Sequence, residues 1–247
     1  MRLVRNGGAM SPGGYIAEPN GEYDWIRRAH WMNRLPAFIV IFFSVIVNGC
    51  FGPSVSGSGR VISETRNVSG FSNVSLEGSG HLIIEQGGAE SLTVTGDDNL
   101  LHYIETEVRG STLVLGEKSG VRLSPSKDIV FKVTLTKLDT LDLSGSGVVE
   151  AKGLQSTKTN IDISGSGEVS AEGADDDLDI AISGSGRFRG DSLKSKRTRV
   201  DLSGSGSAVV AASETLNAII SGSGSIEYVG DPQVHQDISG SGSVRKR

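Results

Sequence analysis

One tetrapeptide, Ser-Gly-Ser-Gly, recurs six times in the second half of this 247-residue chain, and its spacing restricts the possible folds more than any other feature. The copies begin at Ser144, Ser164, Ser183, Ser203, Ser221 and Ser239, and the interval between them is nearly constant. A constant period of about 19 residues indicates a solenoid, in which each repeat stacks on the next. Further copies begin at Ser56 and, as Glu-Gly-Ser-Gly, at Glu77.

Apolar and polar residues alternate on both sides of each tetrapeptide. Around the copy at Ser164, Ile161 and Ile163 precede it and Val169 and Ala171 follow it, and the other copies repeat this pattern. Such alternation is typical of β-strands with one buried face. The sequence therefore predicts an all-β, single-stranded β-helix or solenoid of about 18–20 residues per coil. The polar remainder of each coil, such as residues 154–160, is expected to form another face or a loop.

The same alternation runs through the tetrapeptide, so that its glycines fall on the inward side and its serines on the outward side. Glycine makes up 34 of the 247 residues, roughly twice the usual share of about 7%. We expect the repeated glycines where the chain bends towards the axis, with no room for a side chain and with φ above zero. The serines should stack in two outward columns with a spacing of about 4.8 Å.

The first half of the chain follows this pattern more loosely. Residues 71–84 match a full coil, and strands are expected at 91–95, 112–115 and 129–135. Between them, residues 96–101 predict a turn that leads into a strand or a short helix.

These segments resemble the auto-transporter adhesin family with the head GIN domain. The resemblance rests on Phe71-x-x-Val74-x-Leu76, on Val94-x-Gly96-Asp97-x-Asn99-Leu100-Leu101, on the Ile-x-Ser-Gly-Ser-Gly repeats and on Gly230-Asp231-Pro232. It covers about residues 60–247 and implies a secreted or lipid-anchored bacterial β-helical domain. It brings no catalytic residues.

The N-terminal part carries a targeting signal. Residues 35–47 are an apolar run of 13, preceded by Arg34, which suits a secretory signal better than the roughly 20 residues of a membrane-spanning helix. The run ends in Val47-Asn48-Gly49-Cys50, which resembles the lipobox of bacterial lipoproteins. We therefore expect lipidation of Cys50, and Phe51 after it favours the outer membrane. An uncleaved anchor, or a buried helix with an unrelated cysteine, is the alternative.

Residues 1–31 are too long and too glycine-rich to belong to that signal, which suggests a translation start at Met32. The predicted organisation is an extension over 1–31, a lipoprotein signal peptide over 32–49, a lipidated cysteine with a tether or first turn over 50–59, and the solenoid over 60–247. Five of the 24 Lys and Arg and three of the 29 Asp and Glu precede Cys50, which leaves residues 50–247 a net charge of −7. This acidic balance argues against nucleic acid as a partner.

A search for chemistry assigns no catalytic, cofactor-binding or metal-binding residue. The histidines at 81, 102 and 235 have no ligand spacing, and His81 is expected on the surface. Asp142, Asp162, Asp201 and Asp237 recur two residues before a serine, but Ala181 and Ile219 interrupt the column. A continuous ladder would suggest Ca²⁺; the interrupted one favours a solvated face. An acidic loop is likewise expected at residues 175–177.

The serine columns admit three interpretations: a glycan-binding face, a surface that orders water, or a corner where small residues tolerate close stacking. Solenoid ends expose strand edges that can pair with a second copy. Arg245, Lys246 and Arg247 are predicted to oppose such growth, with attraction to an anionic surface as the alternative.

Together these features predict a lipid-anchored protein of the cell envelope that acts as an adhesin or structural binding module and not as an enzyme. The expected partners are the membrane, through the anchor, and glycans or surface proteins, with homo-oligomers as a further option. The alternative function is a carbohydrate-active β-helix such as a polysaccharide lyase, which would need Asp, Lys and Arg converging in a groove.

Overall fold

The computed structural model describes residues 54–247, which are almost entirely β-strand with one short 3-10 helix, η2 (Leu101–Tyr103). The predicted extension, the signal segment and Cys50 lie outside the described residues. The strands are β1 (Ser54–Ser56), β2 (Val61–Arg66), β3 (Asn73–Gly78), β4 (His81–Gln86), β5 (Ser91–Asp97), β6 (Ile104–Arg109), β7 (Thr112–Glu117), β8 (Arg122–Ser124), β9 (Val130–Leu135), β10 (Thr140–Gly145), β11 (Val148–Gly165), β12 (Glu168–Gly184), β13 (Arg187–Gly204), β14 (Ser207–Gly222), β15 (Ser225–Val229), β16 (Gln233–Gly240) and β17 (Ser243–Lys246).

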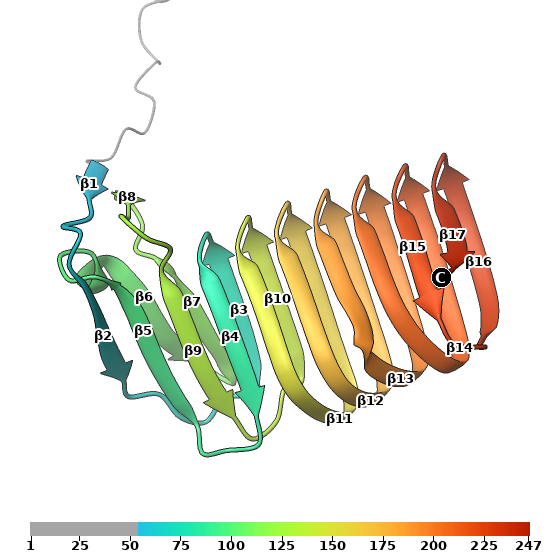
Figure 1. Ribbon diagram of the computed structural model, residues 1–247, viewed down its shortest axis with the longest axis horizontal. Coiled ribbons are helices and arrows are strands. Elements are labelled where there is room, and N and C mark those ends of the chain that lie inside the picture. Colours follow the sequence, from blue (N-terminus) through green and yellow to red (C-terminus); the bar gives the residue numbers. More distant parts are fainter. Residues whose placement is uncertain (1–53) are drawn as a thin grey trace, which may run out of the picture. The chain divides into compact units, whose positions relative to one another are not determined.

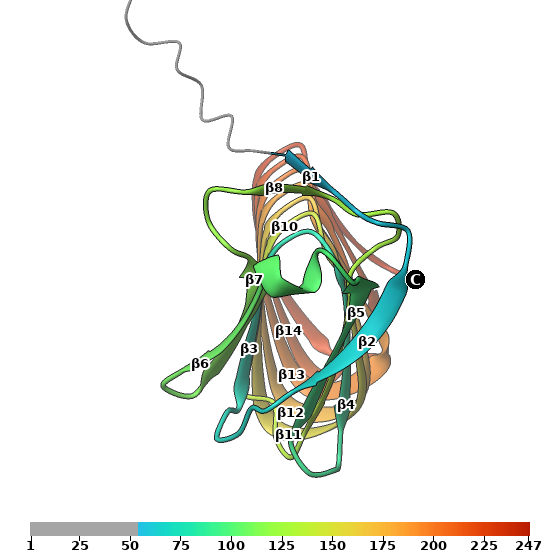
Figure 2. The same ribbon diagram turned by 90° about the vertical axis from the view of Figure 1, so that its left-hand side faces the viewer.

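Strands β11 to β14 each form nearly one complete coil, and the coils stack in parallel (Figure 1). Each coil is a narrow loop with a tight corner at Ser-Gly-Ser-Gly and a wider bend at the opposite end (Figure 2). Ser164 pairs in register with Ser183, which pairs with Ser203, which pairs with Ser221. Because equivalent serines of successive repeats are direct neighbours, this register confirms the predicted β-solenoid and its repeat length.

Two faces result from this winding. We call the serine arm the face whose strands run into the Ser-Gly corner: β3, β10, the second halves of β11–β14, and β16. The return arm is the opposite face: β4, the first halves of β11–β14, β15 and β17. The inner sides of the two arms enclose a single apolar core.

The core confirms the predicted alternation. In the coil around Ser164, Ile161, Ile163, Val169 and Ala171 are all buried. The same holds for the aliphatic and aromatic residues at inward positions beside the tetrapeptides that begin at Ser144, Ser183, Ser203 and Ser221. The one exception is Tyr228, which is half-buried.

The bend decides between the two expectations for the polar segment, another face or a loop. Residues 154–160 continue as strand, with Leu154 and Thr159 fully buried. Polar residues occupy some inward positions here and pair with one another, as Thr159 does with Asp175 of the next coil. The alternation also shifts here, because the pairing of β11 with β12 changes register between Ala151 and Leu154. Alternation in the sequence therefore does not identify the inward residues of the bend.

The first half folds around a coil made of β3 and β4, as residues 71–84 predicted. Strands β5, β7 and β9 confirm the three expected strands, and η2 follows the expected turn. The spatial order departs from the chain order, because β9 pairs with β4 whereas β10 pairs with β3. Antiparallel pairs β2–β5, β5–β9 and β6–β7 complete this end.

The Ser-Gly-Ser-Gly copy at Ser56 does not join the stacked corner. Strand β1 pairs with β8 instead, and Gly57 donates its N–H to the Ser124 carbonyl (2.9 Å). None of residues 54–247 forms a helix with the length and hydropathy to span a bilayer.

Candidate functional site

The Ser-Gly corner needs glycine at both positions, for two different reasons. Gly184 has a φ of +110°, and a Cβ there would lie 2.6 Å from the carbonyl oxygen of Gly165 in the preceding coil. A Cβ on Gly186 would lie 2.6 Å from the Ile163 side chain. The first glycine therefore turns the chain and the second allows it to pass over the core.

These corners build the predicted outward serine columns. The first column is exposed and comprises Ser144, Ser164, Ser183, Ser203, Ser221 and Ser239. The second follows the corner, where the N–H of Ser185 donates to the Gly165 carbonyl (2.8 Å) and the other coils repeat this bond. Backbone hydrogen bonds thus fix the spacing of the hydroxyl groups, which remain free for a ligand or water.

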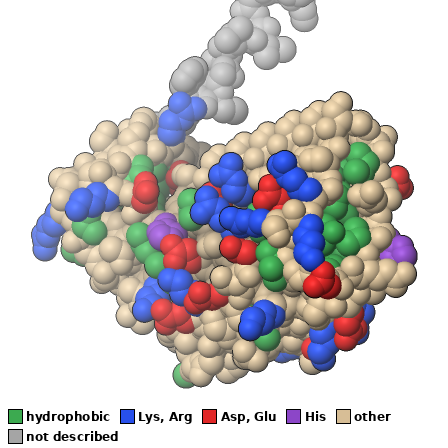
Figure 3. All heavy atoms as spheres, turned by 45° about the vertical axis from the view of Figure 1, so that its right-hand side comes forward, with side chains coloured by type: hydrophobic (Ala, Val, Ile, Leu, Met, Phe, Trp, Pro, Cys, Tyr) green, Lys and Arg blue, Asp and Glu red, His purple; other side chains and the backbone are tan. Residues whose placement is uncertain are grey.

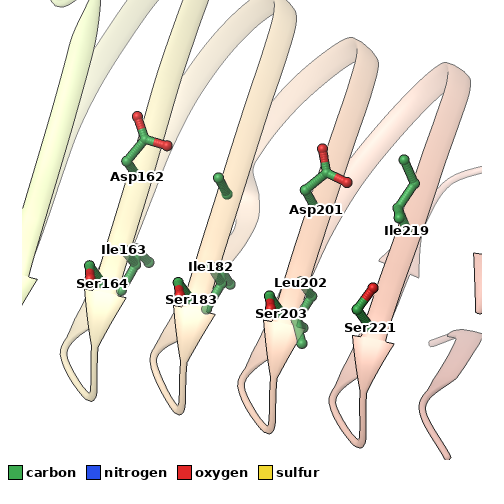
Figure 4. Close-up of a pocket in the computed structure, with 11 residues that line it drawn as sticks. Asp162, Ile163, Ser164, Ile182, Ser183, Asp201, Leu202, Ser203, Ile219 and Ser221 are labelled. Carbon is green, nitrogen blue, oxygen red and sulfur yellow. The ribbon is translucent and has the colours of Figure 1, made fainter. Parts of the chain in front are cut away.

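A shallow trough of about 270 Å³ lies beside the first serine column, on the outer face of the serine arm. Figure 4 shows Asp162, Asp201 and Ile219 in one row and the serines in a second row. Ala181 occupies the position between Asp162 and Asp201. Because alanine is small, it leaves a gap in the row of larger side chains, and this gap forms the trough.

The carboxylates along this row are not arranged for a metal ion. Burial, followed by the proximity of Asp162, raises the pKa of Asp142. Asp201 accepts hydrogen bonds from Arg199 at 2.7 and 3.0 Å. The described part of the chain contains no group of three or more His, Cys, Asp or Glu side chains that could hold a metal.

Residues 175–177, expected as an acidic loop, lie within strand β12 instead, and they comprise one buried and two paired carboxylates. Asp175 is 3% exposed, accepts hydrogen bonds from the Thr159 hydroxyl and the Asp177 N–H, and has a pKa raised chiefly by burial. Asp177 binds Arg197 (2.7 Å), which lowers its pKa. Asp176 binds Lys196 (2.7 Å). The basic partners come from the next coil, so these pairs connect neighbouring coils.

The return arm carries intermixed acidic and basic side chains, as Figure 3 shows over one face of the molecule. His81 is on its outer side as predicted, where it contacts Glu150 (3.0 Å). Lys152, followed by His81, lowers the pKa of Glu150. Arg189 binds Glu168 (3.1 Å).

A depression of about 150 Å³ on this arm is lined by Glu150, Lys152, Glu172, Arg189 and Asp191 among others. Several of these charges already form ion pairs, such as Glu150 with Lys152 (2.8 Å). The geometry gives no specific support to polysaccharide cleavage.

Asp97 is a buried, hydrogen-bonded carboxylate of the kind found in functional sites, and the sequence pattern assigned it no role of its own. It is inaccessible to solvent and accepts hydrogen bonds from the Ser126 hydroxyl (2.6 Å), the Ser126 N–H (2.8 Å) and the Gly59 N–H (2.8 Å). The Ser126 bonds are the main cause of its lowered pKa. The Gly96-Asp97-x-Asn99 motif was the available signal, and its role is structural.

Three solved bacterial structures resemble this chain. A protein from Parabacteroides distasonis described as a "putative lipid binding protein" has 25% sequence identity and a TM-score of 0.56, over 78% of this chain and 99% of its own. A "putative adhesin" from Bacteroides fragilis has 21% identity and a TM-score of 0.65, over 78% and 100%. Another from Parabacteroides merdae has 19% identity and a TM-score of 0.50, over 78% and 99%.

A comparison with curated proteins finds no match. The likenesses to the structures from Bacteroides fragilis and Parabacteroides merdae establish the solenoid fold and not a ligand, because their sequence identity is low. The family model described as "Putative auto-transporter adhesin, head GIN domain" matches residues 70–232, about two thirds of the chain. The repeated corner, the Gly-Asp-x-Asn motif and this match agree, and the chain belongs to that adhesin family.

Proposed function

We propose that this chain is a lipid-anchored envelope protein whose solenoid head binds an extended, hydroxyl-rich chain, a glycan, along its serine arm. Membership of the adhesin family supports a binding role. The observation that carries the proposal is the trough beside Ala181, because it runs parallel to a regularly spaced column of exposed serine hydroxyls.

The chemistry of the trough suits such a ligand. Serine hydroxyls both donate and accept hydrogen bonds, and a carboxylate accepts them. Ala181 and Ile219 add a short apolar surface against which the C–H groups of a sugar ring can pack. A shallow site with these groups would bind weakly per sugar unit and gain strength from contacts repeated along the coils.

The test is an array of glycans and matrix proteins probed with residues 50–247. Ala181→Arg fills the trough from the outside, where Ala181 is exposed, and should reduce glycan binding at least tenfold. Ala211→Arg makes the same change on the outer side of the return arm and should leave binding unchanged. Both variants should unfold at the same temperature as the parent chain. Binding to matrix proteins alone, or equal loss in both variants, would exclude a glycan site in the trough.

The anchor is proposed on the lipobox-like Val47-Asn48-Gly49-Cys50. Mass spectrometry of the mature protein should find a diacylglyceryl group on Cys50 and no peptide from residues 1–49. Cys50→Ser should release the protein from the membrane fraction. A mature chain that retains residues 32–49 would contradict this anchor.

A further inference from the structure

The described chain begins close to Cys50 and is attached to the head from its first residues. We call residues Ser54–Arg60 the strap. Its strand β1 pairs with β8 over three residues, and the strap then passes beside Asp97. Four peptide units separate Cys50 from Ser54.

Polar contacts fasten the strap along its whole length. Asn99 accepts a hydrogen bond from the Ser58 N–H (2.9 Å) and donates one to the Ser56 carbonyl (2.8 Å). The Ser58 hydroxyl donates to Asp98 (2.6 Å), and Gly59 donates to the buried Asp97. A side chain at position 57 would collide with Asp97, so the glycine permits this close approach. The strap is therefore part of the head and not a flexible tether.

Chain length then limits the distance between the head and an anchor. Consecutive Cα atoms lie about 3.8 Å apart, and an extended chain spans at most about 3.6 Å per residue, so Cys50 can lie no more than about 14 Å from Ser54. If Cys50 is lipidated, which rests on the proposed function, the start of the strap at Ser54 lies within about 14 Å of the anchored residue and therefore close to the membrane surface.

The charge at this corner fits an anionic surface. The strap and the facing segment 118–127 contain four basic residues and no acidic one: Arg60, Lys118, Arg122 and Lys127. All four are exposed. Four acidic residues lie nearby: Asp128, which is exposed, Asp98 and Glu117, which are half-buried, and Asp97, which is buried. Asp98 is 3.7 Å from Arg60. The exposed charges of this corner are therefore mainly basic, although residues 50–247 together have a net charge of −7.

We infer that the strap and residues 118–127 form a membrane-contact surface that binds the anionic headgroups of phospholipids around the anchor. One acylated cysteine and a basic patch together make a two-part attachment of the kind that gives stable membrane binding. The head then lies directly on the membrane with a fixed corner towards it, and no stalk separates the two.

The test supplies the anchor chemically, so that it does not depend on lipidation in the cell. Residues 50–247 form one compact unit with a single cysteine. This cysteine can be coupled to a maleimide lipid in vesicles of phosphatidylcholine, either alone or mixed with phosphatidylglycerol. The measurement is the rate at which a water-soluble reagent acetylates each lysine, followed by mass spectrometry.

On the anionic vesicles, acetylation of Lys127 should slow at least threefold, while that of Lys194 at the bend should not change. Acetylation of Lys118 should slow in the same way in the parent chain. In the variant Arg122→Glu/Lys127→Glu, acetylation of Lys118 should no longer slow on the anionic vesicles. In the matched variant Lys194→Glu/Lys196→Glu, it should slow as in the parent chain. Equal rates on both vesicles, or protection at the bend, would overturn the inference. Failure of native Cys50 lipidation would instead appear in the mass spectrum of the mature protein.

Discussion

At the scale of single residues, the buried carboxyl of Asp175 is the most informative group in the bend. It has hydrogen bonds from Thr159 and Asp177 but no cation beside it, and burial raises its pKa in the folded state. The folded chain therefore holds this proton at a pH where the unfolded chain has lost it. Its contribution to stability is greatest below the unfolded pKa and decreases as the pH rises through the folded pKa.

Asp175→Asn should remove this dependence. The amide can accept from the Asp177 N–H and donate to the Thr159 hydroxyl, so both bonds survive without a buried charge. The variant should unfold at a higher temperature than the parent at pH 7, and the gap should close towards pH 3. Asp175→Ala leaves both partners unpaired and should cost about 1–3 kcal/mol. Thermal unfolding across this pH range checks both, and a gap that widens on acidification would refute the assignment.

At the scale of elements, one buried carboxylate connects the strap to the segment that follows β8. Asp97 joins the strap to Ser126, which follows β8. Asp97→Ala should free residues 54–60 and 122–126, so that their amide hydrogens exchange at least tenfold faster, while β11–β14 exchange as in the parent chain. Asp128→Ala removes an exposed carboxylate from the same region and should change neither. Uniformly faster exchange through the solenoid would show that Asp97 supports the whole fold and not one element.

The repeated elements were predictable because their glycines and aliphatic residues have a regular period. The corner at Gly184 and the inward face at Ile161 follow from spacing and alternation alone. The bend was missed because Thr159 and Asp175 place polar atoms at inward positions. The insertion of β3 and β4 between β9 and β10 was also missed, since alternation identifies the buried face of a strand but not its neighbours.

The candidate site was predictable to a similar extent. The serine columns, and the interruption of the aspartate column by Ala181, could be read from the repeat. That this interruption forms a trough requires the register of three adjacent coils. The fixed strap depends on contacts between residues about 40 positions apart, which no local pattern encodes.

At the scale of the whole molecule, the last coil differs from the coils that it covers. Gln236 is in register with the buried Ala218, and Lys246 is in register with Tyr228. Both therefore occupy inward positions at the exposed edge, where Ile238 is 37% exposed. Lys246 also binds Asp231. Polar residues at inward edge positions are a known means of discouraging edge-to-edge pairing.

Replacing these two residues should therefore promote self-association. Gln236→Val/Lys246→Val makes the inner side of the last coil apolar alongside Ile238 and Val244, and a second copy can then cover it. Sedimentation velocity at micromolar concentrations should show a larger average mass than the parent chain has. His235→Val/Arg245→Val adds the same side chains at outward positions of β16 and β17 and should sediment as the parent does. If both variants associate equally, general surface hydrophobicity is responsible; if neither does, Gln236 and Lys246 do not protect the edge.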